Sequence, residues 1–308
     1  MMKELTEDHV VESLFRDRED SVDRVLRSRF GEAFERFSMR LKDRLRLQER
    51  LQKNTGEDEQ MCIDIGRKMN LLDSQTFETV EIATRWTDFG KTGPADATLE
   101  QQSLIARMYA IEKTFPKPPH LMSLRDFLEL SADPDITRRI PEHLETLWDM
   151  GLIECNVRQF INLHAQWTMD IIRDEPAIPY EAKVSAALHH ILEGNNPDGL
   201  VDLSTEELMI PSLNRPIGMQ EILTILLDKY QARRRFPIPG TERLRTHAEQ
   251  IEWLRIYMEK YVALKQYPSW LREKLHACIN VLEGAGPFSE FFAADREAEN
   301  VEAALAAK

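Results

Sequence analysis

Two adjacent histidines, His189 and His190, stand at the end of an apolar run and directly before a loop rich in glycine, asparagine and proline. Neighbouring residues of an α-helix point about 100° apart, so two adjacent imidazoles can face one metal ion only near a helix end or in a distorted turn. The loop supplies such an end, because Gly, Asn and Pro-Asp-Gly stop helices and form turns. A surface helix end with two solvated imidazoles is the alternative interpretation of the pair taken alone.

Further potential metal ligands lie on other segments that are expected to be helical. His164 lies within an expected helix from Asn156 to Ile172, and Glu221 lies inside an apolar helix that follows Pro216. A buried carboxylate needs a partner or a metal. Three histidines with carboxylates suit Fe, Mn or Zn better than Mg²⁺ or Ca²⁺. The potential ligands are Asp88, His164, His189, His190 and Glu221.

A lysine bracketed by two glycines follows Asp88. In the segment TDFGKTG, from Thr87 to Gly93, Gly90 and Gly93 lie on either side of Lys91. A flexible lysine of this kind can reach a phosphate as a point charge. The composition is also that of an ordinary loop, and the segment lacks the P-loop spacing.

Length, charge and cysteine content limit the classes of protein. A chain of 308 residues can bury a sizeable core, as one large domain or two smaller ones. The net charge of -13 argues against a general DNA-backbone binder, while a small anion in a local basic pocket stays compatible with it. Three widely spaced cysteines argue against a disulfide framework and favour a reducing cytosol. Because no apolar run is long enough to span a bilayer, we expect a cytoplasmic protein without membrane insertion.

The hydrophobic pattern predicts an all-α fold. Apolar residues recur at three- and four-residue steps from about Glu12 to Leu51, disturbed only by Gly31, which predicts a long N-terminal helix. This helix either packs on the core or serves dimerisation or signal relay. Its arginines are interpreted as a solvated face: Arg40, Arg44, Arg46 and Arg50. A further helical stretch is expected to break at Tyr267-Pro268, and no strand or repeat pattern is present.

The order and context of these segments resemble the HD-GYP family, all-helical phosphodiesterases of cyclic di-GMP within the HD phosphohydrolase superfamily. WTDFGKTGPADATL, from Trp86 to Leu99, resembles the family's His-Asp-x-Gly-Lys-x-Gly-x-Pro-Asp segment. NLHAQW, from Asn162 to Trp167, sits where the family has its next metal-ligating histidine. ALHHILEGNNPDGL, from Ala187 to Leu200, resembles the His-His helix end and its Gly-Tyr-Pro-Asp-Gly-Leu loop. The segments from Ile210 to Leu226 and from Gln266 to Leu275 are similar to the family's last ligand-bearing segment and its closing helix.

The chain departs from the family at the metal ligands. Thr87 replaces the signature histidine, the preceding ligand histidine is missing near Thr55, and Asn195-Asn196 replaces the signature Gly-Tyr. The resemblance implies one metal held by Asp88, His164, His189 and His190. The other metal would lack two histidines and have Glu221 in place of an aspartate. Because a threonine hydroxyl is a poor substitute for imidazole on a transition metal, one ion rather than two is expected.

The resemblance also implies the remaining roles. Asp88 and Lys91 would act at the reacting phosphate. The cyclic dinucleotide would be bound by Lys91, Arg215, Asn196, Pro197, Asp198 and Gly199. The expected organisation is an N-terminal helical segment over residues 1–53, an HD-GYP-like helical domain over 54–283 with an insertion at about 100–149, and a C-terminal tail over 284–308.

Three functions follow from these patterns. The first is a degenerate HD-GYP-type protein of cyclic di-GMP signalling that binds a cyclic dinucleotide with weak or no hydrolysis, because a two-metal site that loses one metal loses much of its rate. The second is an active metal-dependent phosphodiesterase in which Glu57 or Glu59 supplies a missing ligand. The third is a ligand-free helical scaffold in which the histidines are merely packed. In each case a homodimer formed through the N-terminal helix remains compatible with the sequence.

Overall fold

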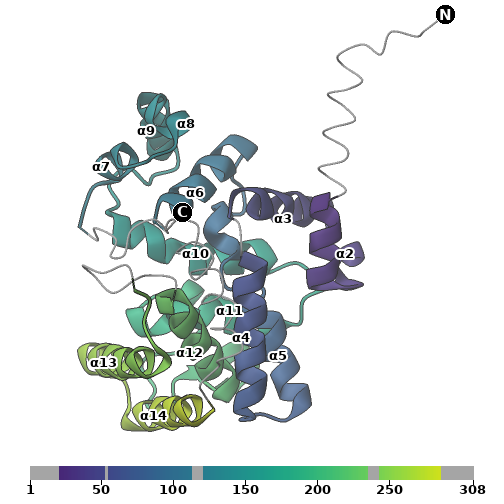
Figure 1. The fold of residues 1–308 in the computed structure, drawn as a ribbon, viewed down its shortest axis with the longest axis vertical. Coiled ribbons are helices and arrows are strands. Elements are labelled where there is room, and N and C mark those ends of the chain that lie inside the picture. The colour runs from purple at the N-terminus through teal and green to yellow at the C-terminus, as the bar shows by residue number, and fades with distance from the viewer. Residues whose placement is uncertain (1–20, 53–54, 113–120, 235–242, 286–308) are drawn as a thin grey trace, which may run out of the picture. The chain divides into compact units, whose positions relative to one another are not determined.

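A computed structural model of the chain describes residues 21–52, 55–112, 121–234 and 243–285 (Figure 1). Nearly all regular structure in these residues is helical, and the predicted all-α class is confirmed. Within the described part of the chain, no helix is both long and apolar enough to cross a membrane. The described residues form two compact units. Unit 1 contains those up to 56, from 88 to 112 and from 121 to 179, and unit 2 contains those from 57 to 87 and from 180 onward.

Unit 1 is assembled around a short 3-10 helix, η1, which packs on three helices that lie far apart in the sequence. A first helical stretch over residues 21–30 precedes the named elements. The elements of unit 1 are α2 (Ala33–Arg36), α3 (Met39–Leu51), η1 (Phe89–Thr92), α6 (Leu99–Glu112), α7 (Leu124–Glu129), α8 (Pro134–Thr137), α9 (Ile140–Asp149) and α10 (Val157–Ile172). The strongest packing of η1 is against α10, followed by α6 and α3.

The single long N-terminal helix predicted from the sequence is wrong for its described part. Gly31 adopts a left-handed conformation with φ +57°, and the helix ends there. A second interruption precedes α3, whose N-cap is Ser38. The Ser38 hydroxyl accepts a hydrogen bond from the backbone N–H of Leu41, which satisfies one of the unpaired donors at a helix start. Leu41 and Leu45 are buried, which supports the packed interpretation, and a dimer through this segment stays a prediction.

Unit 2 is centred on α12 (Met219–Arg234). This helix contacts five other elements, because its run from Ile222 to Leu227 is buried on every side. The other elements are α4 (Thr55–Met69), α5 (Ser74–Thr84), α11 (Tyr180–Ala187), η2 (Leu188–Glu193), η3 (Pro197–Gly199), β1 (Met209–Ile210), η4 (Pro211–Leu213), β2 (Arg215–Pro216), α13 (His247–Lys265) and α14 (Ser269–Gly284). The two short strands pair antiparallel, with Ile210 opposite Arg215. The predicted break at Tyr267-Pro268 is confirmed, since Gln266 ends α13 in a left-handed conformation.

The two units differ in extent from the domains expected from the sequence, whose boundaries stay predictions. The boundary expected at residue 53 does not separate the N-terminal helices from later segments, because α3 packs against both η1 and α6. The segment expected as an insertion at about 100–149 contributes α6 to this packing, and α7, α8 and α9 contact one another. The tail expected over 284–308 lies, after residue 285, outside the described residues.

The packing of η1 on α10 requires a glycine at position 90. The backbone N–H of Gly90 donates a hydrogen bond to the Thr168 hydroxyl at 2.8 Å. A Cβ at Gly90 would lie 2.6 Å from the backbone nitrogen of Thr168 and closer still to the carbonyl oxygen of His164. Only glycine allows backbones to approach this closely. Gly90 therefore holds Asp88 and Lys91 against the helix that carries His164.

We expect Gly90→Ala to destabilise the protein by about 3 kcal/mol, because the added methyl group overlaps backbone atoms that cannot move without shifting α10. Urea unfolding followed by circular dichroism measures the change. Gly284→Ala is the matched control, since a Cβ there has nothing within 4 Å, and it should change stability by no more than about 1 kcal/mol. Equal unfolding midpoints for the two variants would contradict the packing described here.

Candidate functional site

In unit 1, Asp88, Lys91 and His164 lie together. Oδ2 of Asp88 is 2.6 Å from Nζ of Lys91, and Oδ1 is 3.7 Å from Nε2 of His164. Nδ1 of His164 is 2.6 Å from the carbonyl oxygen of Ile161. A carbonyl oxygen only accepts, so Nδ1 carries a proton, and in the neutral ring Nε2 is the nitrogen with the lone pair. Metal-ligating histidines have this second hydrogen bond, which fixes the tautomer.

The position of Lys91 differs from the flexible lysine expected from the sequence. Lys91 belongs to η1 and its side chain is 9% exposed. Besides the ion pair with Asp88, its ammonium lies 6.0 Å from the centre of the Tyr109 ring. Gly90, the residue before Lys91, is required for the close approach of η1 to α10 rather than for loop flexibility. Because the Lys91 ammonium already pairs with Asp88, a phosphate would have to share it with that carboxylate.

Arg44 holds the segment after η1 in place. It is 1% exposed, so its interpretation as part of a solvated face is wrong. Its guanidinium donates to four backbone carbonyls, those of Thr92, Gly93, Pro94 and Ala95. Burial lowers its pKa to about 10. Gln48 on the same helix and Gln52 at its C-cap donate to the carbonyls of Asp88 and Lys91, respectively. Thus α3 positions both ends of η1.

In unit 2, the histidine pair occupies a distorted helix end, as predicted. The α-helix stops at Ala187 and continues as the 3-10 helix η2, which Gly194 ends at φ +90°. Nδ1 of His189 is 2.6 Å from the carbonyl oxygen of Ala186, so its proton sits on Nδ1 and its lone pair on Nε2. The rings of His189 and His190 have centroids 4.3 Å apart.

Asp228 on α12 is a potential ligand that the sequence analysis missed. It offers a carboxylate oxygen within 4.8 Å of a ring nitrogen of His189. Asp228 follows Glu221 by seven residues, which is about two turns along the same helix face. That spacing is the signal that could have found it. The chain therefore contains histidine and aspartate groups that could hold a metal ion.

Glu221 and Arg215, predicted as metal ligand and phosphate contact, form a buried pair with each other. Glu221 is fully buried, and Arg215 donates to its two carboxylate oxygens at 2.9 and 3.0 Å. The Ser185 hydroxyl and the backbone N–H of Gly218 donate to the same oxygens, both at 2.7 Å. The hydrogen bond to Glu221 raises the pKa of Arg215. These contacts meet the need of a buried carboxylate for a partner, and both predicted roles stay predictions.

The loop after the histidines is closed by Asn196. Its side-chain amide donates to the carbonyl of Val201 at 2.7 Å and accepts from the Val201 N–H at 3.0 Å. Pro197 is buried, whereas Asp198 and Gly199 are exposed and adopt left-handed conformations. The contact of these four residues with a dinucleotide stays a prediction.

The residues at the missing-histidine positions make local hydrogen bonds. The Thr87 hydroxyl donates to the Thr84 carbonyl at 3.1 Å, and the Thr55 hydroxyl donates to the Gln52 carbonyl at 2.7 Å. Of the two glutamates considered as replacement ligands, Glu59 is 5% exposed, whereas Glu57 is on the surface.

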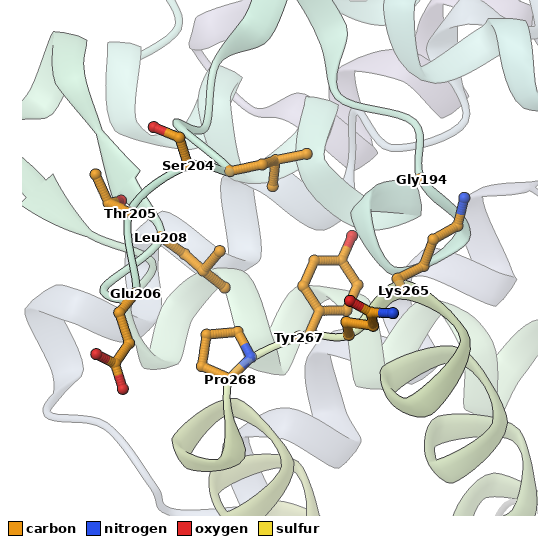
Figure 2. Close-up of a pocket in the computed structure, with 10 residues that line it drawn as sticks. Gly194, Ser204, Thr205, Glu206, Leu208, Lys265, Tyr267 and Pro268 are labelled. Carbon is orange, nitrogen blue, oxygen red and sulfur yellow. The ribbon is translucent and has the colours of Figure 1, made fainter.

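Unit 2 also contains a cavity of about 480 Å³ that no sequence signal indicated. Figure 2 shows Lys265 and Glu206 on opposite sides of it, with Leu208, Tyr267 and Pro268 between them. Neither charged side chain makes a hydrogen bond or ion pair with another described residue. The Tyr267 hydroxyl donates to the Ile191 carbonyl, which ties one wall of the cavity to η2.

Comparison with protein-family models, with curated proteins and with solved structures found no match to this chain.

We expect Arg44→Lys to destabilise the protein by about 2 kcal/mol, because an ammonium cannot reproduce the planar fork that reaches several carbonyls at once, and buried carbonyls left unpaired cost free energy. Thermal unfolding measures the effect. Arg40→Lys, on the same helix but exposed, should leave the melting temperature unchanged. A melting temperature for Arg44→Lys equal to that of the unaltered protein would show that the carbonyl contacts contribute little.

Proposed function

We propose that this chain is a degenerate HD-GYP-type protein of cyclic-dinucleotide signalling that binds one divalent transition metal and a cyclic di-GMP-like ligand, with weak or no hydrolysis. The supporting observation is the orientation of two histidines. His164 and His189 each donate from Nδ1 to the carbonyl three residues earlier, which leaves Nε2 as the nitrogen with a lone pair. Each also has an aspartate close by, Asp88 for His164 and Asp228 for His189.

The proposed metal ligands are imidazoles and carboxylates. The resemblance implies five ligands, which are Asp88, His164, His189, His190 and Glu221. Nitrogen and oxygen ligands of this kind suit Fe, Mn or Zn. Such an ion, when bound, polarises a phosphoryl oxygen.

The proposed ligand is an anion because two basic side chains are held at fixed positions. Lys91 and Arg215 each pair with one carboxylate, Asp88 and Glu221 respectively. In a protein with a net charge of -13, a dianion binds only where local cations are concentrated. Charge-assisted hydrogen bonds from lysine and arginine are the usual contacts to phosphodiesters.

Weak hydrolysis follows from the residues at the second metal position. The Thr87 hydroxyl donates its hydrogen bond to a backbone carbonyl, and neutral hydroxyls bind transition metals poorly. A single metal cannot stabilise both the attacking and the leaving oxygen. One observation favours the alternative of an active phosphodiesterase: Glu59 is a buried carboxylate on α4, the helix that begins at Thr55.

We expect His164→Ala to lower the metal affinity at least tenfold, because it removes an oriented nitrogen ligand. His143→Ala is the matched control, since His143 is also a buried histidine of unit 1 that hydrogen-bonds to a backbone carbonyl. Elemental analysis after dialysis against a weak chelator measures retained metal. The same metal content in both variants would remove the basis for this site.

We expect the unaltered protein to bind cyclic di-GMP in the presence of Mn²⁺ and to hydrolyse it slowly or not at all. Lys91→Ala and Arg215→Ala should each weaken binding by about 1.5–3 kcal/mol, the value of a hydrogen bond to a charged group. Calorimetric titration measures affinity, and chromatography of the products measures hydrolysis. Arg272→Ala is the control, since this arginine of α14 is exposed and pairs with Glu259.

The outcomes separate the candidate functions. Rapid hydrolysis with Mn²⁺ or Fe²⁺ would favour the active phosphodiesterase over the receptor. Failure of the metal-loaded protein to bind any cyclic dinucleotide would contradict both and leave the helical scaffold. Melting temperatures of the Lys91 and Arg215 variants, measured in parallel, separate loss of binding from loss of folding.

A further inference from the structure

Unit 2 contains a buried group of charged side chains beside the histidine pair. Lys229 follows Asp228 on α12, and Glu193 is the last residue of η2. Their side chains are 6% and 7% exposed. Burying charges is costly unless they are paired and hydrogen-bonded. The pairing of these groups therefore indicates which kind of ion the group binds.

The ammonium of Lys229 has three hydrogen-bond partners in the described part of the chain. Its Nζ lies 2.9 Å from Oδ2 of Asp228, 3.0 Å from Oε1 of Glu193 and 3.1 Å from Nδ1 of His190. An ammonium group has three N–H donors. Each donor therefore has one acceptor, and two carboxylates and an imidazole surround the cation as ligands surround a metal ion.

The same contacts indicate which nitrogen of His190 carries the proton. Nδ1 of His190 also lies 3.2 Å from Oε1 of Glu193, so it can either donate to Glu193 or accept from Lys229. Oε1 already accepts from Lys229 and from the Tyr257 hydroxyl. The third donor of Lys229, in contrast, has Nδ1 as its one acceptor among the residues that the structure describes. Acceptance by Nδ1 satisfies all these groups and places the His190 proton on Nε2, the opposite of His164 and His189.

The surroundings of the ammonium favour a resident cation, because two carboxylates and an imidazole nitrogen lie within 3.1 Å of one buried Nζ. Oε2 of Glu193 is buried and has no hydrogen-bond partner, so this carboxylate retains ligand capacity that Lys229 does not use.

We propose that Asp228, Glu193 and His190 form a cation site in which the protein's own Lys229 ammonium takes the place of a divalent metal ion. Two carboxylates and an imidazole nitrogen are a ligand set that Zn²⁺, Mn²⁺ and Fe²⁺ accept. The inference deepens the proposed function, on which it rests only for the expectation that the unaltered protein binds one metal ion. If the ammonium already occupies a cation position in unit 2, one metal ion rather than two is expected. His190, which the resemblance implies as a metal ligand, is then a hydrogen-bond acceptor of Lys229.

Removal of the ammonium tests the proposal. Lys229→Ala leaves the three acceptors without a cation, so this variant should bind one more Co²⁺ per chain than the unaltered protein, measured by calorimetric titration and by the visible absorption of bound Co²⁺. Adding Glu193→Gln to Lys229→Ala should abolish the extra binding. Lys183→Ala is the matched control, because Lys183 lies in the same unit and is likewise a buried lysine. It should bind the same number of ions as the unaltered protein.

The metal counts keep this proposal and the proposed function apart. If the unaltered protein binds no Co²⁺ but Lys229→Ala binds one, the proposed metal function fails and the built-in cation stands. If both proteins bind one ion, the built-in cation is overturned while the proposed metal function stands.

A measurement on the unaltered protein decides the matter even if Lys229→Ala does not fold. Nitrogen-15 NMR of histidine-labelled protein, with His190 assigned by its loss in His190→Gln, reports the protonation of each ring nitrogen. The proposal expects a protonated Nε2 and an unprotonated Nδ1. A proton on Nδ1 of neutral His190 would show that Nδ1 donates to Glu193 rather than accepting from Lys229, and would overturn the proposal.

Discussion

The free-energy cost of burying carboxylates is the constraint on which both units depend. A buried carboxylate without a partner is too costly to keep ionised, so each one in the candidate site has a basic side chain from its own unit. Lys91 pairs with Asp88, Arg215 with Glu221, and Lys229 with both Asp228 and Glu193. Three of these pairs join residues close in sequence, and the pair of Lys229 with Glu193 joins α12 to η2. The acidic groups of each unit are therefore compensated, and the proposed metal and anion would bind by exchanging partners with these pairs.

The histidines are positioned by backbone rather than by side chains. His164 and His189 donate to carbonyls three residues earlier, a contact that helical geometry offers when the ring turns back along its own helix. The main chain must then be placed accurately. In unit 1 this is done by Gly90, which lets η1 touch α10, and by Arg44, which binds the carbonyls after η1. In unit 2 the change from α-helix to 3-10 helix at Leu188 re-aims the two rings.

The sequence predicted what depends on local pattern and missed what depends on tertiary contacts. Helical periodicity predicted the all-α class, and the Gly-Asn-Pro composition predicted the distorted helix end at His189 and His190. The single glycine at position 31 does not by itself predict a helix end, because helix propensity does not reveal a left-handed residue. Arg44 looked like a surface arginine, since charge patterns do not show that four carbonyls lie nearby. Lys229 gave no signal, because its partner Glu193 is distant in sequence.

The proposed metal and the proposed anion are linked through the ion pairs. In unit 1, Asp88 and Lys91 neutralise each other at 2.6 Å. A cation that takes Asp88 removes the partner of Lys91 and leaves a buried ammonium with an unsatisfied charge. A phosphate then restores the balance, so each ligand favours the other, as thermodynamic linkage requires. In unit 2 a metal would not displace Lys229 from Asp228 in this way, because Lys229 is tied to two carboxylates and an imidazole at once. A lysine held by one carboxylate can be shared with a ligand, whereas a lysine held by three acceptors acts as a structural cation.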